Sequence, residues 1–250
     1  MYSQVKSSFL YNMSSFVSWK GLVVCITGAN RGIGYAIAKN LSAQGALIYA
    51  TCRRSNEQLN ALNLNGGAVV EGIDMMDDDC GNKLAARISS EHHLDVLLNN
   101  AGILEPDNFE TINSPDALKS AKDMYEVNAL GPVKVTTALS PRLKEGGKMF
   151  MMSSLMGSLS DNGSGNMFGY RMSKAAMNMA GKNLAIHLKD RSIAVQVIHP
   201  GFVKTDMTAR FGGGGKDVDA QAAQLIDVMA RADLANTGKF IRYDGTEDPW

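Results

Sequence analysis

The chain has 250 residues, of which 45% are hydrophobic, and a chain of this size can bury the core of one α/β domain without metals or disulfides. Its 25 basic and 25 acidic side chains cancel, so it lacks the basic excess that nucleic acid binding requires. No apolar run reaches the roughly 20 residues of a membrane-spanning helix. We therefore expect one soluble, cytoplasmic domain with no nucleic acid or membrane partner.

The three cysteines, Cys25, Cys52 and Cys80, are an odd number without C-x-x-C spacing. This pattern favours free thiols in a reducing compartment over a disulfide framework or a zinc site. We expect no bound metal.

The first twenty residues contain six serines, two lysines and no acid, which is partly typical of an organelle transit peptide. They contain no arginine, however, and Met13 offers a second start. We expect residues 1–20 to be a disordered or artefactual extension, and the folded domain to span residues 21–250.

From Gly21 onward, short runs rich in Val and Ile alternate with longer segments of helical period. In one of these segments Ile33, Ile37 and Leu41 recur every four residues before Gly45, as in a helix that ends at a glycine. The pattern predicts β-α-β units in a doubly wound, Rossmann-type α/β fold, with helices on both faces of a parallel seven-stranded sheet. The predicted strands are 22–27, 46–51, 68–73, 95–99, 148–153, 193–199 and 239–243.

The first predicted strand, LVVCIT, runs directly into the turn GANRGIG, which contains Gly28, Gly32 and Gly34. Without a Cβ, glycine permits a tight turn and lets the backbone approach a pyrophosphate, which the amides of a helix N-terminus attract. Such a turn can serve sterics alone, but its place after the first strand favours a dinucleotide site.

The spacing G-x-x-x-G-x-G, preceded by Thr27, resembles that of the short-chain dehydrogenase/reductase family, and NNAG at 99–102 matches a second motif of that family. The resemblance extends from about Gly21 to the end of the chain. It implies that NNAG steadies the central sheet and lines the adenosine side of a cofactor site. The implied cofactor residues in these two segments are Thr27, Gly28, Asn30, Arg31, Gly32, Ile33, Gly34, Asn100, Ala101 and Gly102.

The charge after the second predicted strand favours NADPH or NADP+ over NAD. An acid there would bind the ribose hydroxyls of NAD, whereas a basic group would hold a 2′-phosphate. The chain has Cys52 in about that place, followed by Arg53 and Arg54, and Arg31 adds a further guanidinium. A single arginine could simply lie on a solvated loop edge, but three arginines at these positions favour phosphate binding.

The end of the third predicted strand carries Asp74 and Met75. By resemblance Asp74 contacts the adenine ring, although an aspartate before a helix is also an ordinary N-cap.

Tyr170 and Lys174 lie four residues apart in a segment of helical character, so they share a face. A nearby ammonium stabilises a phenolate and lowers its pKa, which makes Tyr170 a usable general acid or base. Alone, this spacing would indicate a half-buried aromatic beside a solvated lysine. The glycine turn, NNAG and the SKAA string favour catalysis, and the resemblance implies that Lys174 also binds the nicotinamide ribose.

Ser153 and Ser154 end the fifth predicted strand, and parallel sheets bind ligands at such carboxyl ends. We predict that Ser154 bonds the substrate carbonyl oxygen and stabilises charge there. Its separation from Tyr170, 170 − 154 = 16 positions, exceeds the family's usual spacing, so Ser153 and Ser158 stay alternatives.

Further positions follow from the resemblance. Asn128 matches an asparagine that kinks the fourth helix and holds a water of a proton relay, although alone it would be a turn or cap residue. The segment HPGFVKTDM supplies positions around the nicotinamide, namely Pro200, Gly201, Val203 and Thr205.

Three further features lie outside the predicted catalytic set. His199 could suggest a Ser/His/Asp hydrolase, but no G-x-S-x-G elbow accompanies it, so we expect a structural role. The glycine-rich segment after Thr205 predicts a mobile lid, or else a surface loop without a role. Trp250 is expected near the substrate entrance or a partner subunit.

Together these features predict NADPH-dependent reduction of an aldehyde or ketone, with Tyr170 as general acid. Within the family, TGANRGIG, GYRMSKAA and HPGFVKTDM are similar to the carbonyl reductases of the C-factor and sniffer group. The resemblance implies a homodimer formed through the helices that hold Asn128 and Tyr170. Two alternatives stay open: a cofactor-bound signalling protein with a vestigial site, and an NAD-linked alcohol or hydroxysteroid dehydrogenase.

Overall fold

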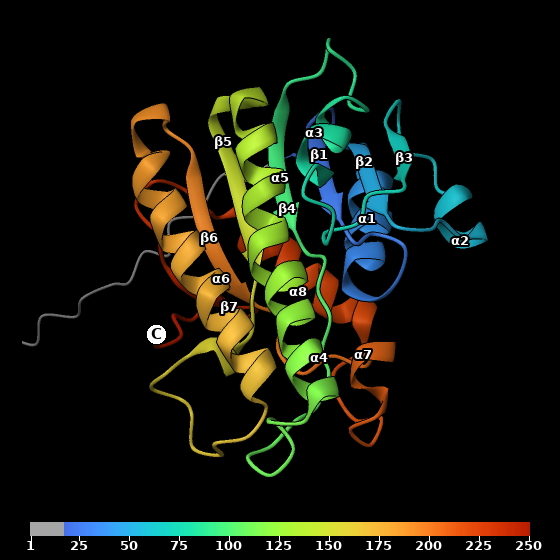
Figure 1. Cartoon of the computed structure of the whole chain (residues 1–250). Coiled ribbons are helices and arrows are strands. Elements are labelled where there is room, and N and C mark those ends of the chain that lie inside the picture. The colour runs from blue at the N-terminus through green and yellow to red at the C-terminus, as the bar shows by residue number, and fades with distance from the viewer. Residues whose placement is uncertain (1–17) are drawn as a thin grey trace, which may run out of the picture.

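The computed structural model describes residues 18–250 and shows the predicted doubly wound fold (Figure 1). Seven parallel strands form one sheet in the order β3-β2-β1-β4-β5-β6-β7. The order reverses between β1 and β4, and a sheet of this kind binds ligands at that switch point. The strands are β1 Val23–Thr27, β2 Leu47–Cys52, β3 Ala68–Glu71, β4 Leu94–Asn99, β5 Leu143–Met152, β6 Ala194–His199 and β7 Phe240–Arg242.

Helices cover both faces of the sheet. They are α1 Gly32–Ala43, α2 Glu57–Asn60, α3 Cys80–Ala85, α4 Pro115–Tyr125, α5 Gly131–Leu139, α6 Phe168–His187, α7 Asp206–Ala209 and α8 Val218–Ala230. A π-helical turn, Glu126–Leu130, joins α4 to α5, and short 3-10 turns are formed by Ser140–Arg142, Leu155–Gly157 and Lys189–Arg191.

The alternation of side chains along each strand produces two cores. From β1, Val24 and Ile26 face α1 and α8, which bury Leu41 and Leu225 in the same cluster. The intervening Cys25 faces the opposite core, which α3, α5 and α6 cover. Because the strands are buried on both faces, their near-continuous apolar runs have a structural explanation.

Most strand boundaries agree with the sequence predictions to within two residues, and two boundaries of the fold differ more notably. Strand β5 begins at Leu143 rather than Lys148, because Leu143 pairs with Leu94 before the register of the β4–β5 ladder shifts. Trp19 is 4% exposed and packs into the α1 core, so the folded domain begins before residue 21. The rest of the expected extension, residues 1–17, lies outside the described residues. Within residues 18–250 no helix combines the length and the apolarity that crossing a bilayer requires.

Candidate active site

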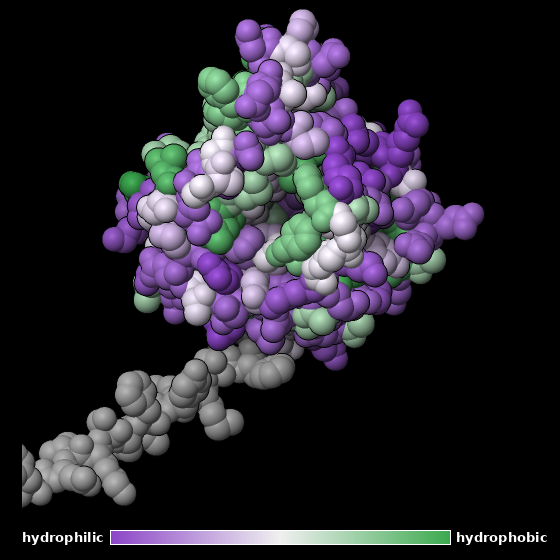
Figure 2. All heavy atoms as spheres, turned by 90° about the horizontal axis from the view of Figure 1, so that it is seen from below, coloured by the Kyte–Doolittle hydropathy of each residue, from purple (hydrophilic) through white to green (hydrophobic). Residues whose placement is uncertain are grey.

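A cavity of about 1310 Å³ opens at the carboxyl ends of the strands. Figure 2 looks onto this end of the molecule and shows a hollow bordered by hydrophobic side chains. The walls come from the β1–α1 turn, the ends of β2, β4 and β5, the first turns of α6 and the segment after β6. The predicted site residues among them are Gly28, Asn30, Arg31, Gly32, Ile33, Arg53, Arg54, Asp74, Met75, Asn100, Ala101, Gly102, Ser153, Tyr170, Lys174, Pro200 and Thr205.

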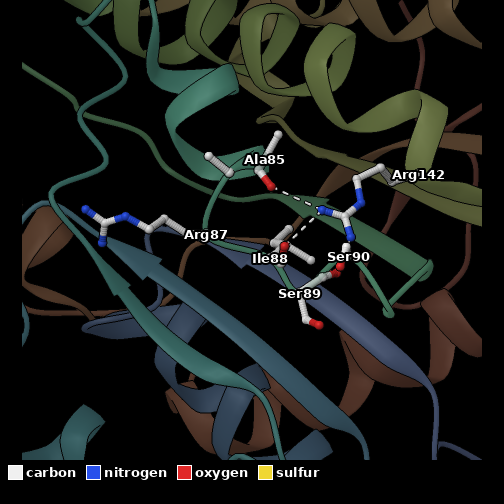
Figure 3. A pocket seen from close by; sticks show the side chains of 7 residues that line it. Ala85, Arg87, Ile88, Ser89, Ser90 and Arg142 are labelled. Atoms are coloured by element: carbon white, nitrogen blue, oxygen red, sulfur yellow. Dashed lines mark hydrogen bonds between the residues drawn. The ribbon is translucent and has the colours of Figure 1, made fainter.

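A second hollow, of about 630 Å³, lies at the opposite end of the sheet, beside the start of β5 (Figure 3). The guanidinium of Arg142 donates from Nη1 to the carbonyl oxygens of Ala85 at 3.1 Å and Ile88 at 3.0 Å, and from Nη2 to His92 O at 2.8 Å. Arg142 therefore secures the chain after α3, and this hollow has a structural explanation.

The glycine turn leaves no room for a side chain at Gly28 or at Gly34. Gly28 has a φ of +66°, and a Cβ there would stand 2.8 Å from the Cα of Ala101. A Cβ on Gly34 would stand 2.4 Å from the Gly28 carbonyl oxygen. The close packing of turn, helix and strand end therefore requires glycine at both positions.

The N-terminus of α1 has the character of an anion site. Its N-cap residue, Arg31, makes no capping hydrogen bond through its side chain, and the first turn contains no acidic residue. The positive end of the helix dipole and its amides therefore face the cavity without an internal anion. This arrangement fits the pyrophosphate of a dinucleotide.

Thr27 and Asn100 join β1 to β4 beneath the turn. The Thr27 hydroxyl, buried with its residue 1% exposed, accepts hydrogen bonds from the amides of Asn100 at 3.0 Å and Ala101 at 3.1 Å. The Asn100 side chain donates in turn to Thr27 O at 2.9 Å and Gly28 O at 3.1 Å. Thr27 therefore supports the turn without lining the cavity. Gly34 likewise supports it, through close packing.

The arginines follow β2 as predicted. Arg53 and Arg54 are exposed and line the cavity beside Cys52, whose thiol pKa is raised to about 11 by burial and by nearby Glu71. Arg31 also lines this cavity and pairs with Asp206 at 3.3 Å. This side of the cavity is thus rich in guanidinium groups and offers no reactive thiolate.

Asp74 is not the N-cap of a long helix. Its carboxylate accepts a hydrogen bond from the amide of Met76 at 3.1 Å, and α3 begins only at Cys80, capped at Asp79. Asp74 instead ends the loop after β3 and, with Met75, lines the cavity.

Tyr170 and Lys174 lie in the first two turns of α6, and both are buried, with exposed fractions of 7% and 4%. Lys174 Nζ lies 5.8 Å from the centre of the Tyr170 ring and donates to the carbonyl oxygen of Met152 at 2.8 Å. Burial lowers the pKa of Lys174 to about 7. The pair therefore sits in a desolvated corner where the strands β4 and β5 end.

The expected depression of the Tyr170 pKa is wrong for this structure. Burial raises it to about 12, and an interaction with the Ser154 hydroxyl acts more weakly in the opposite direction. The ammonium of Lys174 lies over the ring, 5.8 Å from its centre, and is itself desolvated, so it does not offset burial. A high pKa keeps the phenol protonated but makes it a weak acid, so proton donation by Tyr170 requires a cation that stabilises the phenolate.

The three candidate serines have different partners. Ser153 is 3% exposed and donates to Asn178 Oδ1 at 2.5 Å, and Ser158 is 2% exposed and accepts from the amide of Asp161 at 3.1 Å. Ser154 is partly exposed, accepts from the amide of Met156 at 3.2 Å, and is the serine that interacts with the Tyr170 hydroxyl. The interaction with Tyr170 favours Ser154, whereas Ser153 is the serine that lines the cavity.

The enlarged loop between Ser154 and Tyr170 is tied down at several points. Arg171 donates from Nε to Asn166 O at 3.0 Å and from Nη1 to Met156 O at 3.3 Å. Ser160 Oγ donates to the main-chain oxygen of Trp250 at 2.8 Å, while the Trp250 ring stacks on Phe240. These contacts explain why sixteen positions of separation still leave Ser154 beside Tyr170.

Asn128 lies in the π-helical turn, so the helix is irregular where the sequence predicted a kink. Its side chain accepts from the Ile103 amide and donates to the Ile103 carbonyl, each at 2.8 Å, and donates to Ser173 Oγ at 3.0 Å. A Cβ at Gly102 would stand 3.2 Å from Asn128 Oδ1 and 3.6 Å from Lys174 Nζ. Gly102 therefore leaves space between these two polar groups.

The segment after β6 divides between the cavity and the core. Pro200 and Thr205 line the cavity. Gly201 has a φ of +78°, and a Cβ there would stand 2.8 Å from the Tyr243 ring. Val203, 2% exposed, pairs with Lys216 at the base of the glycine-rich segment. Neither Gly201 nor Val203 lines the cavity, so their positions serve packing.

His199 accepts a 3.3 Å hydrogen bond from the amide of Gly201, and burial lowers its pKa to about 4 despite an opposing effect of Asp248. These features agree with the structural role predicted for it. Within residues 18–250 no group of three or more His, Cys, Asp or Glu side chains has a metal-binding arrangement.

Sequence reasoning missed Asp107, whose carboxylate reaches the first turn of α6. It lies more than sixty positions from Tyr170 in a loop without a motif, so no spacing in the sequence signals the contact. It also missed the Met152 carbonyl as the acceptor for Lys174, because backbone groups leave no trace in a residue pattern.

Comparisons with known proteins agree with this site. A family model described as short chain dehydrogenase matches residues 22–213. The 1-hydroxy-2-glutathionyl-2-methyl-3-butene dehydrogenase of Rhodococcus sp. (strain AD45) is 34% identical over 230 residues, which cover 91% of this chain and 99% of the relative.

Two solved carbonyl reductases also match. Carbonyl reductase Sniffer of D. melanogaster has a TM-score of 0.82 at 30% identity, and the NADPH-bound carbonyl reductase from chicken fatty liver has 0.79 at 28%. Each match covers 92% of this chain and all of the other. The predicted resemblance and fold are thereby confirmed.

Proposed function

Because the chain belongs to the short-chain dehydrogenase family, we propose that it reduces an aldehyde or ketone to an alcohol with NADPH, with Tyr170 as the proton donor. The family assignment makes it an oxidoreductase that uses a nicotinamide cofactor. The observation that carries the finer proposal is that Tyr170 and Lys174 line the glycine-turn cavity together, while the Ser154 hydroxyl interacts with that of Tyr170.

The residues of the cavity fit a dinucleotide. The uncapped N-terminus of α1 and the glycines of the turn would hold the pyrophosphate. Arg31, Arg53 and Arg54 would hold a 2′-phosphate through charge-assisted hydrogen bonds, which favours NADPH over NADH. Asp74 would contact the adenine ring, and Pro200 and Thr205 would border the nicotinamide.

Bound NADPH would supply the hydride that reaches the substrate carbonyl carbon. The Ser154 hydroxyl donates a hydrogen bond to the carbonyl oxygen and stabilises the charge that develops there. Tyr170 transfers its phenolic proton to that oxygen as the C=O bond becomes a C–O single bond, which yields the alcohol.

The phenolate left on Tyr170 needs a cation and a proton. Lys174, when protonated, stabilises the phenolate, and it would also bind the ribose of the nicotinamide. As the family resemblance implies, Asn128 would hold a water through which Lys174 returns a proton to the phenolate. Because its amide is bonded to both main-chain groups of Ile103, Asn128 has a fixed orientation for this role.

The test compares the wild-type protein with Tyr170→Phe and with the control Tyr125→Phe on α4, outside the cavity. Absorbance of reduced nicotinamide is followed with a panel of aldehydes, ketones and quinones. We expect Tyr170→Phe to abolish turnover while NADPH affinity, measured by cofactor fluorescence, is nearly unchanged. Full turnover by Tyr170→Phe would contradict the assignment, and bound NADPH with no turnover by the wild type would favour a regulatory role.

We also propose a homodimer formed through α4 and α6. Met172, Met179 and Ile186 recur every seven residues on α6 and are 55%, 62% and 67% exposed. Leu118 and Tyr125 are likewise exposed and seven residues apart on the neighbouring α4. Exposed apolar side chains that recur on two neighbouring helices support an isologous contact between two copies.

A further inference from the structure

We propose that Asp107 is a positioning residue that holds the first turn of α6, and with it Tyr170, in the orientation that proton transfer requires. The inference rests on the proposed function, in which Tyr170 is the proton donor. Asp107 lies in the loop that follows β4, far from Tyr170 in sequence, and it touches neither the cofactor turn nor Ser154.

The first turn of α6 has no cap of its own. Its N-cap residue, Met167, has left-handed backbone angles with a φ of +63° and makes no side-chain capping bond. An unbranched side chain rarely adopts this conformation unless other contacts hold it there. The leading amides of the helix, Phe168 and Gly169, therefore need acceptors from elsewhere.

Asp107 supplies all of these acceptors. Its carboxylate accepts from the amide of Phe168 through one oxygen and from the amide of Gly169, at 2.9 Å, through the other. Its carbonyl oxygen accepts from the amide of Met167 at 3.0 Å, which holds the strained residue. A carboxylate at a helix N-terminus is also favoured by the dipole, and Asp107 is only 8% exposed.

The opposite side of the same turn is blocked by α4. A Cβ on Gly169 would stand 2.6 Å from the terminal methyl of Met124 and 2.9 Å from the Cβ of Ala121. The turn is therefore packed between α4 and Asp107 and cannot shift toward α4. Tyr170 is the next residue of this turn, so loss of the carboxylate lets its ring move away from Ser154 and from the substrate carbonyl oxygen.

Geometry at this level has a large effect on rate, because misplacement of a catalytic group by about 1 Å can cost about 10²-fold in turnover. We expect Asp107→Ala to lower kcat by about 10²-fold. NADPH affinity should change little, because no cofactor residue moves. Asp107→Asn keeps one acceptor oxygen in place, so it should recover part of the lost kcat.

The experiment includes Asp217→Ala as a control, because Asp217 also places a carboxylate at a helix N-terminus: it is the N-cap residue of α8 and accepts from the amide of Ala220 at 2.9 Å. Steady-state kcat and KM, NADPH affinity and melting temperature are measured for each variant. We expect Asp217→Ala to lower the melting temperature while kcat stays near the wild-type value. An unchanged kcat in Asp107→Ala, or an equal loss in Asp217→Ala, would overturn the inference.

A readout without turnover separates this inference from the proposed function. The phenolic pKa of Tyr170, followed by tyrosine NMR and assigned with Tyr170→Phe, is raised to about 12 by burial. When the turn loosens in Asp107→Ala, water reaches the phenol, and its pKa should fall toward the ordinary value of about 10. If the wild type shows no reductase activity but this shift occurs, the positioning role stands and the proposed function fails. If Asp107→Ala does not fold, Asp107→Asn decides: a wild-type kcat and pKa in that variant contradict the role.

Discussion

The side chain of Asn100 lies directly against Gly34: a Cβ added at Gly34 would stand 2.4 Å from Asn100 Nδ2. That nitrogen also donates to the main-chain oxygens of Thr27 and Gly28, so it cannot move without breaking the link between β1 and β4. The phosphate turn and the NNAG segment are therefore one packed unit.

Gly34→Ala should damage this unit. We expect it to weaken NADPH binding at least about tenfold and to lower the free energy of unfolding by about 1–3 kcal/mol, because the new methyl group overpacks a rigid contact. Cofactor fluorescence titration and urea unfolding measure the two effects. Gly163→Ala is the control, since a Cβ there meets nothing within 4 Å. Wild-type affinity in Gly34→Ala would show that the turn can relax.

Much of this arrangement could be predicted from the sequence. The alternation of apolar runs and helical segments predicted the parallel sheet, and Gly28, Gly34 and NNAG predicted the turn, because these features depend on local spacing. Whether Gly34 touches the cofactor or only Asn100 could not be predicted, since that depends on which atoms the fold brings together.

The sequence was least informative about electrostatics and distant contacts. It predicted that Lys174 lowers the pKa of Tyr170, whereas burial, which no local pattern reports, dominates both pKa values. The Asp107 contact with α6 is likewise a product of tertiary packing. The π-helical turn at Asn128 was foreseen only as a kink implied by the family.

Replacement of the three serines should separate catalysis from support. We expect Ser154→Ala to lower kcat by about 10²-fold with NADPH affinity intact, because it removes a donor to the developing oxyanion. Ser153→Ala removes the hydrogen bond to Asn178 and should instead lower the free energy of unfolding by about 1 kcal/mol. Steady-state kinetics measures kcat, and urea unfolding measures the free energy of unfolding, for both variants and for Ser158→Ala. A larger kcat loss in Ser153→Ala than in Ser154→Ala would reverse the assignment.

The arginines after β2 should select the cofactor. Loss of a charge-assisted contact to the 2′-phosphate in Arg53→Ala or Arg54→Ala should weaken NADPH binding by about tenfold or more. NADH lacks that phosphate, so its affinity should stay unchanged. Titrations with both cofactors test this, with the exposed Arg87→Ala, at the opposite end of the sheet, as control. Equal losses for NADPH and NADH would mean that these arginines do not recognise the 2′-phosphate.

Burial of Lys174 should make folding stability depend on pH. Its pKa is lowered to about 7 in the folded protein and is about 10.4 in an unfolded chain. Between these values the unfolded state binds more protons, so this residue makes stability rise with pH, and its burial penalty is complete below about pH 7.

Lys174→Met should remove that penalty. Its advantage over the wild type in urea unfolding should be largest near pH 6 and should shrink steadily toward pH 9, below the range in which Tyr170 titrates. Lys122→Met, on the exposed surface of α4, is the control. A difference between Lys174→Met and the wild type that does not vary with pH would show that Lys174 is not desolvated in the folded protein.

The apolar face of α6 should decide the oligomeric state. Residues seven apart lie two helical turns apart on one face, so Met172, Met179 and Ile186 form an exposed apolar stripe, which Lys182 and Asn183 interrupt. A lysine introduced at Met179, the centre of the stripe, would be desolvated in the interface and would face its own copy across a two-fold axis. We expect sedimentation velocity to show a dimer for the wild type and a monomer for Met179→Lys. Leu234→Lys, which alters an exposed apolar residue outside α4 and α6, should stay dimeric. A dimer that survives Met179→Lys must use another surface, and a monomeric wild type would contradict the homodimer itself.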